Sequence, residues 1–92
     1  MGDQVLIDVR TPEEFSAGHL PGACNLDLNG GGFASALASL DRSASYLLYC
    51  RSGNRSGEAA AMLQRAGFTD VRNLGSVQEA ADALGTVITT DQ

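Results

Sequence analysis

The chain has 92 residues, of which 43% are hydrophobic and 18% are charged, with no lysine and a formal net charge of −5. This length is enough for one domain with one modest core, so we expect residues 1–92 to form a single domain. The acidic balance argues against a surface for nucleic acids or anionic membranes, because both need clustered positive charge. The apolar runs are only a few residues long, too short to span a membrane.

The first residues and the cysteines limit the compartment and the cofactors. No basic and then apolar signal peptide opens the chain, which favours the cytoplasm. Met1 and Gly2 can be expression additions, so a removed leader, and with it the periplasm, stays open. Cys24 and Cys50 are too few for a disulfide framework and, with His19 as the single histidine, for a four-ligand zinc site. We expect no metal and no other cofactor.

The chain opens with signals for a strand and then a helix. The apolar segment 5–8 (VLID) predicts a buried strand. Thr11 then starts a helix, because Pro12 suits the first helical position and Glu14 completes a capping box. Gly18 can end this short helix.

The later elements continue the alternation of strands and helices. In chain order we predict a short strand at 23–28, a Gly-rich bend at 30–32, a helix at 33–40, a strand at 46–49, a helix at 56–68, a strand at 70–74, a helix at 76–85 and an edge strand at 87–90. Gly67 supplies a left-handed stop for the third helix, and Phe68 can fold back onto its last turn. Ser76 and Glu79 form a second capping box.

This alternation predicts an α/β fold, with a small, mainly parallel sheet flanked by helices on both faces. Ligands of such sheets bind beyond the carboxyl ends of the strands, and Cys50 stands at one of these ends.

Cys50 opens a loop, CRSGNRS, between a strand end and a helix start. The first turn of a helix has backbone N–H groups without partners, and these groups and the helix dipole stabilise a thiolate and lower its pKa. The candidate site consists of Cys50 and the residues after it: Arg51, Ser52, Gly53, Asn54, Arg55 and Ser56. The glycine and asparagine let the loop curl, the serines offer hydroxyl donors, and the arginines hold charge near an oxyanion. The alternative is a buried cysteine followed by a polar turn, which needs neither the arginines nor the serines.

Two blocks of the sequence resemble the rhodanese family, sulfurtransferases that carry sulfur as a cysteine persulfide. They are 6-LIDVRTPEEFSAGHLPGACNLDL-28 and 47-LLYCRSGNRSGEAAAMLQRAGFTDVRNL-74, in the order and spacing of that family. The resemblance implies that Cys50 is the nucleophile, that the amides of the loop surround its sulfur, and that Arg55 closes the loop.

The resemblance also suggests roles for residues outside the loop. Asp8 and Arg10 match the family's Asp-x-Arg and are expected to support the site without reacting. We expect Glu14 to form an ion pair with Arg10. We expect His19 to have a structural role in the turn and not to act as a general base.

Loop length separates two chemistries that share this fold. Cysteine phosphatases, including the rhodanese-like ones, keep five residues between cysteine and arginine, whereas four lie between Cys50 and Arg55. The smaller loop suits a single sulfur atom and has no acidic residue to serve as a general acid. The loop length therefore favours a sulfurtransferase over a cysteine phosphatase.

The resemblance implies ping-pong transfer of sulfane sulfur from thiosulfate, or a similar small anionic donor, through a persulfide on Cys50 to a thiol or to cyanide. Arg51 is the candidate for steering the donor. An alternative is a carrier that delivers persulfide sulfur to a protein partner, which an exposed apolar patch beside the loop would favour. An inactive interaction module is disfavoured because Cys50 and Arg55 are both present. We expect a monomer without nucleic-acid or membrane partners.

The chain departs from the family at its ends and at one cysteine. Little stands before Val5, where the family has a strand and a helix, so the chain looks short at its N-terminus. Segment 87–90 can cover the sheet edge that this leaves open. Cys24 is either a resolving thiol for Cys50 or a small buried residue, and we favour the buried residue.

Overall fold

The structure is a computed structural model that describes residues 4–90. Four strands alternate with four helices. In chain order the elements are β1 (Gln4–Asp8), α1 (Pro12–Ala17), β2 (Cys24–Asn25), α2 (Gly32–Leu37), β3 (Ser45–Cys50), α3 (Asn54–Arg65), β4 (Val71–Ser76) and α4 (Val77–Leu84). The predicted strands and helices up to residue 85 are all present, with boundaries that differ by a few residues.

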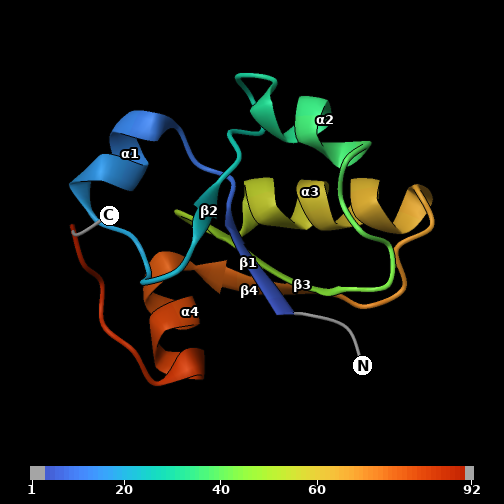
Figure 1. Cartoon of the computed structure of the whole chain (residues 1–92). Coiled ribbons are helices and arrows are strands. Elements are labelled where there is room, and N and C mark those ends of the chain that lie inside the picture. Colours follow the sequence, from blue (N-terminus) through green and yellow to red (C-terminus); the bar gives the residue numbers. More distant parts are fainter. Residues whose placement is uncertain (1–3, 91–92) are drawn as a thin grey trace.

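The strands form one parallel sheet in the order β2-β1-β3-β4. Helices α2 and α3 lie on one side of this sheet and α4 lies on the other (Figure 1). The chain leaves β1 toward α1, which lies past the carboxyl ends of the strands and meets the start of α3 there through Glu14 and Arg55. This architecture confirms the predicted α/β class.

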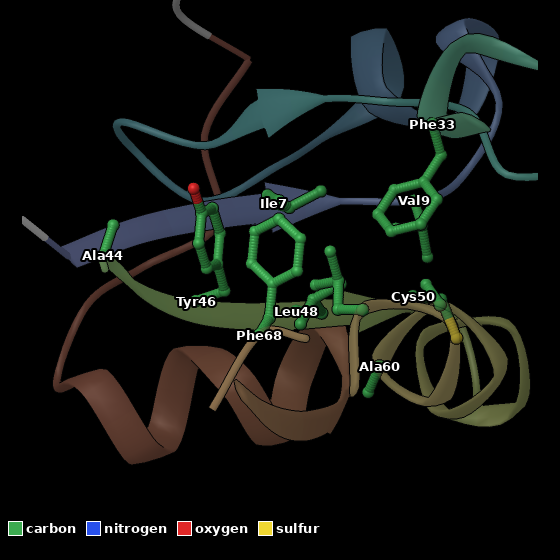
Figure 2. Packing of buried hydrophobic residues seen from close by; sticks show 11 residues of the cluster. Ile7, Val9, Phe33, Ala44, Tyr46, Leu48, Cys50, Ala60 and Phe68 are labelled. Atoms are coloured by element: carbon green, nitrogen blue, oxygen red, sulfur yellow. The ribbon is translucent and has the colours of Figure 1, made fainter. Parts of the chain in front are cut away.

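The two faces of the sheet bury cores of different size. The larger core joins β1, β3, α2 and α3, and its buried members are Ile7, Val9, Phe33, Ala44, Tyr46, Leu48, Cys50, Ala59, Ala60, Leu63 and Phe68. Phe33 and Val9 approach Cys50 in this core (Figure 2). The smaller core under α4 contains Leu20, Tyr49, Ala80 and Ala81. The side chain of Cys50 therefore lies on the side of the sheet that has the larger core.

Helix α3 shows how local signals set the boundaries near the site. It begins at Asn54, two residues before the predicted start, because Gly53 adopts a left-handed conformation (φ 94°) and turns the chain into the helix. It ends as expected, since Gly67 has φ 99° and the N–H of Phe68 returns to the carbonyl of Leu63 at 3.0 Å.

The segment after α4 differs from the prediction. Thr89 forms an isolated antiparallel bridge with His19, with N···O distances of 2.7 and 2.8 Å, and does not pair with a strand of the sheet. Val87 is 73% exposed, so its side chain does not pack into the core. The backbone of the buried residue His19 needs partners, and Thr89 supplies them. The prediction of an edge strand at 87–90 that covers the sheet edge was wrong.

Candidate active site

Cys50 is the last residue of β3, and its side chain has no exposed surface. The N–H of Gly53 donates to Cys50 Sγ at 2.9 Å, and Ser56 Oγ lies 3.5 Å from the same sulfur. Gly53 forms no side-chain cap for α3, so the start of this helix faces a sulfur atom rather than a capping hydroxyl. The loop that follows Cys50 thus turns back toward its sulfur.

The surroundings of Cys50 change the acidity of its thiol. Burial raises the pKa of the Cys50 thiol, but hydrogen bonds outweigh burial, so the pKa lies below its ordinary value. The backbone N–H groups of Ser56, Ser52 and Gly53 are among these donors. A thiolate is the nucleophilic form of cysteine, so this environment favours reactivity.

Arg55 forms a two-point ion pair with Glu14, with N···O distances of 2.8 and 3.1 Å. Arg55 lies in the first turn of α3, and Glu14 is the third residue of α1, where it also completes the capping box with Thr11. The hydrogen bond from Arg55 is the main reason why the pKa of Glu14 falls to about 2. The prediction that Glu14 pairs with Arg10 was wrong, because the carboxylate that caps α1 faces the start of α3.

Arg10 pairs instead with Asp8 on the same strand end. Its Nε lies 2.9 and 3.0 Å from the two carboxylate oxygens, and its Nη2 lies 2.6 Å from Asp8 Oδ2 and 2.6 Å from the carbonyl of Gly18. Both residues are buried, and the Arg10 guanidinium lies 5.6 Å from the centre of the Tyr49 ring. The pair connects β1, the turn before β2 and the residue before Cys50, which agrees with a supporting role.

The remaining loop residues face solvent. Arg51, Ser52 and Asn54 are exposed. Within residues 4–90, Arg51 has neither a hydrogen bond nor an ion pair, so its charge is available to an approaching anion. His19 lies in the turn as expected, stacked on Phe15 with ring centres 3.8 Å apart and with Nδ1 2.8 Å from the carbonyl of Phe15.

Sequence reasoning missed one residue of this site, Asn73 of β4. Its Oδ1 lies 2.6 Å from Ser56 Oγ, and its Nδ2 lies 3.2 Å from the carbonyl of Gly53. Asn73 stands in a stretch that predicts an ordinary strand, and the register irregularity of β3 and β4 near this point brings it to the loop. No local pattern in the sequence signals that contact.

Cys24 fits neither of its two predicted roles. It is exposed rather than buried. It lies on β2, which β1 separates from β3. Two strand spacings amount to about 10 Å, more than the roughly 7 Å that a disulfide allows between Cα atoms. Cys24 therefore cannot bridge to Cys50 without a large movement of the backbone.

Two further features concern metals and membranes. Across residues 4–90, the His, Cys, Asp and Glu side chains form no group of three or more that could hold a metal ion. None of the helices in that same range has the length and apolar character to cross a membrane.

The family model described as the rhodanese-like domain matches residues 1–82 of this chain. The chain belongs to the rhodanese-like domain family. Among curated rhodanese relatives, the chain is 36% identical over 75 residues to thiosulfate sulfurtransferase PspE of Escherichia coli, and the match covers 82% of this chain and 72% of PspE. It is 42% identical over 67 residues to thiosulfate sulfurtransferase GlpE of Pseudomonas putida, covering 73% of this chain and 59% of GlpE.

A solved structure shares both the fold and part of the sequence. It is described as a rhodanese with anions from E. coli, and it superposes with a TM-score of 0.78 at 31% identity, covering 96% of this chain and 99% of its own. The rhodanese resemblance of the two sequence blocks is therefore confirmed at the level of the family and of the fold.

Proposed function

We propose that this chain is a sulfurtransferase that moves sulfane sulfur from thiosulfate, or from a similar small anionic donor, through a persulfide on Cys50. The observation that carries the proposal is the sulfur of Cys50, held 2.9 Å from the N–H of Gly53 at the start of α3. Relatives named thiosulfate sulfurtransferases support the choice of chemistry. Amides that stabilise a thiolate remove the need for a separate base.

The first step forms the persulfide. The Cys50 thiolate attacks the outer sulfur of thiosulfate and forms a new S–S bond. The bond between that sulfur and the sulfite sulfur breaks, and sulfite leaves with the electron pair. The terminal sulfur of the persulfide carries the negative charge and lies where the amides of the loop converge.

The second step removes the sulfur. A thiolate or cyanide attacks the terminal sulfur, the S–S bond of the persulfide breaks, and Cys50 returns as a thiolate. A thiol acceptor leaves as a persulfide and cyanide leaves as thiocyanate. The protein alternates between two covalent states, which gives ping-pong kinetics.

Arg51 steers the anionic donor in this mechanism, because it is exposed and its charge is unpaired within residues 4–90. Arg55 contributes differently, since Glu14 neutralises its charge and holds the first turn of α3 in place. Cys50 is fully buried, so the donor reaches the sulfur only after a local movement of the protein.

Sulfite release from thiosulfate tests the proposal. Cys50→Ser removes the nucleophile and should lower the rate by about a thousandfold or more. Cys24→Ser is the matched control, because it changes an exposed cysteine on β2, and it should keep its rate within about twofold. Sulfite release by Cys50→Ser at the rate of the original chain would overturn the proposal.

Intact mass identifies the intermediate. After treatment with thiosulfate the mass should rise by one sulfur atom, about 32 Da, and return to its starting value with dithiothreitol. An aryl phosphate should not be hydrolysed, and turnover of that substrate would support a phosphatase instead.

The carrier alternative draws no support from the surface of the described part. Its exposed large hydrophobic residues are Leu84, Val87 and Ile88, at the end of α4 and in the segment after it. These residues do not belong to the Cys50 loop. We therefore propose a small acceptor rather than a protein acceptor.

A further inference from the structure

A hydrogen-bond network ties the Cys50 loop to β4 through Asn73. Asn73 Oδ1 lies 2.9 Å from the N of Gly75 and 2.6 Å from Ser56 Oγ. Asn73 Nδ2 lies 3.2 Å from the carbonyl oxygen of Gly53. One side chain thus contacts the loop, the first turn of α3 and its own strand.

The two backbone partners fix the orientation of the Asn73 amide. The N–H of Gly75 can only donate, so it requires an oxygen opposite it. The carbonyl of Gly53 can only accept, so it requires the NH₂ group. An exchange of the amide oxygen and nitrogen would bring two donors together at Gly75 and two acceptors together at Gly53.

This orientation determines the direction of the Ser56 hydroxyl. Asn73 Oδ1 has no hydrogen, so Ser56 must donate the bond of 2.6 Å. The hydroxyl has a single hydrogen and cannot also point at Cys50 Sγ, which is 3.5 Å away. A hydroxyl turned toward the sulfur would leave two oxygens in repulsive contact at 2.6 Å. The hydrogen bonds to the sulfur then come from backbone amides, and the nitrogen of Gly53 lies 2.9 Å from it.

We propose that Asn73 is a positioning residue that takes the hydrogen of the Ser56 hydroxyl and anchors Gly53, so that backbone amides alone hold the resting thiolate. A thiolate without the hydroxyl bond is more basic and a stronger nucleophile, because nucleophilicity rises with thiol pKa. The proposal rests on the proposed function, in which Cys50 is the reacting group.

The local packing supports this network. A Cβ atom on Gly57 would lie 3.3 Å from Asn73 Nδ2, and one on Gly53 would lie 3.3 Å from the Cα of Gly75. The loop and the first turn of α3 therefore approach β4 more closely than larger residues would permit. The charged groups around Cys50 are Arg51 of the loop, Arg55 of α3, its partner Glu14 of α1, and Asp27, whose charge also acts on Arg55. The variants below leave all four unchanged.

The test measures alkylation of Cys50 by iodoacetamide as a function of pH, in a Cys24→Ser background so that one thiol reacts. Ser56→Ala should move the Cys50 pKa by less than about 0.3 units, because Ser56 does not donate to the sulfur. Asn73→Ala should free the hydroxyl to turn to the charged sulfur, which is a better acceptor than the neutral carbonyl of Gly53 at 3.2 Å from Ser56 Oγ. The Cys50 pKa should then fall by about one unit, and the plateau rate at high pH by about threefold.

The double variant provides the decisive control. In Ser56→Ala with Asn73→Ala the pKa should return close to that of the parent, since the hydroxyl that caused the fall is absent. A fall of equal size in the double variant would overturn the proposal, as would a rise of the pKa in Asn73→Ala.

Ser56→Ala alone keeps the proposal testable if Asn73→Ala does not fold. A rise of about one unit in the Cys50 pKa of Ser56→Ala would show that the hydroxyl already donates to the sulfur, and would refute the proposal. Alkylation does not depend on sulfur transfer. A chain that fails to release sulfite can therefore still show the predicted pattern, and the two proposals fail separately.

Discussion

Helices α1 and α4 begin in one way and α3 begins in another. At α1 the hydroxyl of Thr11 accepts from the N–H of Glu14, and at α4 the hydroxyl of Ser76 accepts from the N–H of Glu79. Both starts are complete capping boxes. Helix α3 starts at Gly53 without a side-chain cap, and the sulfur of Cys50 accepts a hydrogen bond from the N–H of Gly53. At the starts of α1 and α4, side chains of the helix and its cap accept the free backbone N–H groups. At the start of α3, a thiol at the end of the preceding strand accepts one.

The difference shows how one chain uses helix starts for stability and for chemistry. A capping box satisfies the free amides of the first turn with neutral or acidic side chains close in sequence. At α3 those amides remain available to an anion. Glu14 connects the two types of start, because it caps α1 and also pairs with Arg55 in the first turn of α3. Glu79 has the same place in α4 but is exposed and has no cationic partner within residues 4–90.

The largest expected effect comes from a change in the glycine at the start of α3. Gly53→Ala places a Cβ 3.3 Å from the Cα of Gly75 at a residue with φ 94°. The strain should cost about 1–3 kcal/mol of unfolding free energy, and displacement of the Gly53 amide from the sulfur should raise the Cys50 pKa. Chemical denaturation and the pH dependence of Cys50 alkylation measure the two effects.

Gly22→Ala is the matched control for that substitution. Gly22 also has a positive φ, 82°, but a Cβ atom there has no neighbour within 4 Å. It should lose about 1 kcal/mol through strain alone, with no change in the Cys50 pKa. An equal shift of that pKa in both variants would mean that the start of α3 has no special relation to the thiol.

The second-largest expected effect comes from Glu14, and it distinguishes the capping box of α1 from that of α4. Glu14→Gln keeps an oxygen that can complete the box at α1 but removes the charge that pairs with Arg55. The side chains of this pair are 23% and 28% exposed, so solvent reduces its contribution to about 1 kcal/mol of unfolding free energy. Sulfite release should also fall, because the first turn of α3 loses a contact that holds it.

Glu79→Gln is the control, since it makes the same chemical change in the other capping box. Its effect on stability and on sulfite release should be smaller than that of Glu14→Gln. Similar losses in the two variants would show that the cap, not the ion pair, is the important feature of Glu14.

The smallest expected effect is the pH dependence of the same pair. The pKa of Glu14 is about 2 in the folded chain, below the ordinary value of 4.5. The stabilisation is therefore complete above about pH 4.5 and is lost as the pH falls through about 2. The difference in unfolding free energy between the original chain and Glu14→Gln should shrink across this range. Denaturation curves at pH 7, 4.5 and 2.5 measure it, and a constant difference would contradict this origin.

The sequence predicted those parts of the site that depend on neighbours along the chain. The capping boxes of α1 and α4, the stop at Gly67 and the loop after Cys50 all involve residues within a few positions of one another. Such contacts follow from backbone geometry and residue type, so their patterns are visible without a fold. The spacing of apolar segments predicted that strands alternate with helices, and this alternation predicted a parallel sheet.

Contacts that depend on packing between distant segments could not be predicted from the sequence. Glu14 lies 41 residues from Arg55, and either Arg10 or Arg55 could have satisfied it. Asn73 reaches the loop because β3 and β4 are adjacent and their register shifts near Tyr49. The bridge between Thr89 and His19 likewise depends on where the chain runs after α4.

By itself the sequence determined a thiol at a strand end, a loop that turns into a helix, and a family in which that arrangement is shared. Only the tertiary structure decided which charge pairs with Arg55, that Cys24 is exposed two strands away, and that Ser56 Oγ lies 2.6 Å from Asn73 Oδ1 but 3.5 Å from Cys50 Sγ. The physical reason is that a helix start is a local feature, whereas the partner of a side chain is chosen by the packing of the sheet.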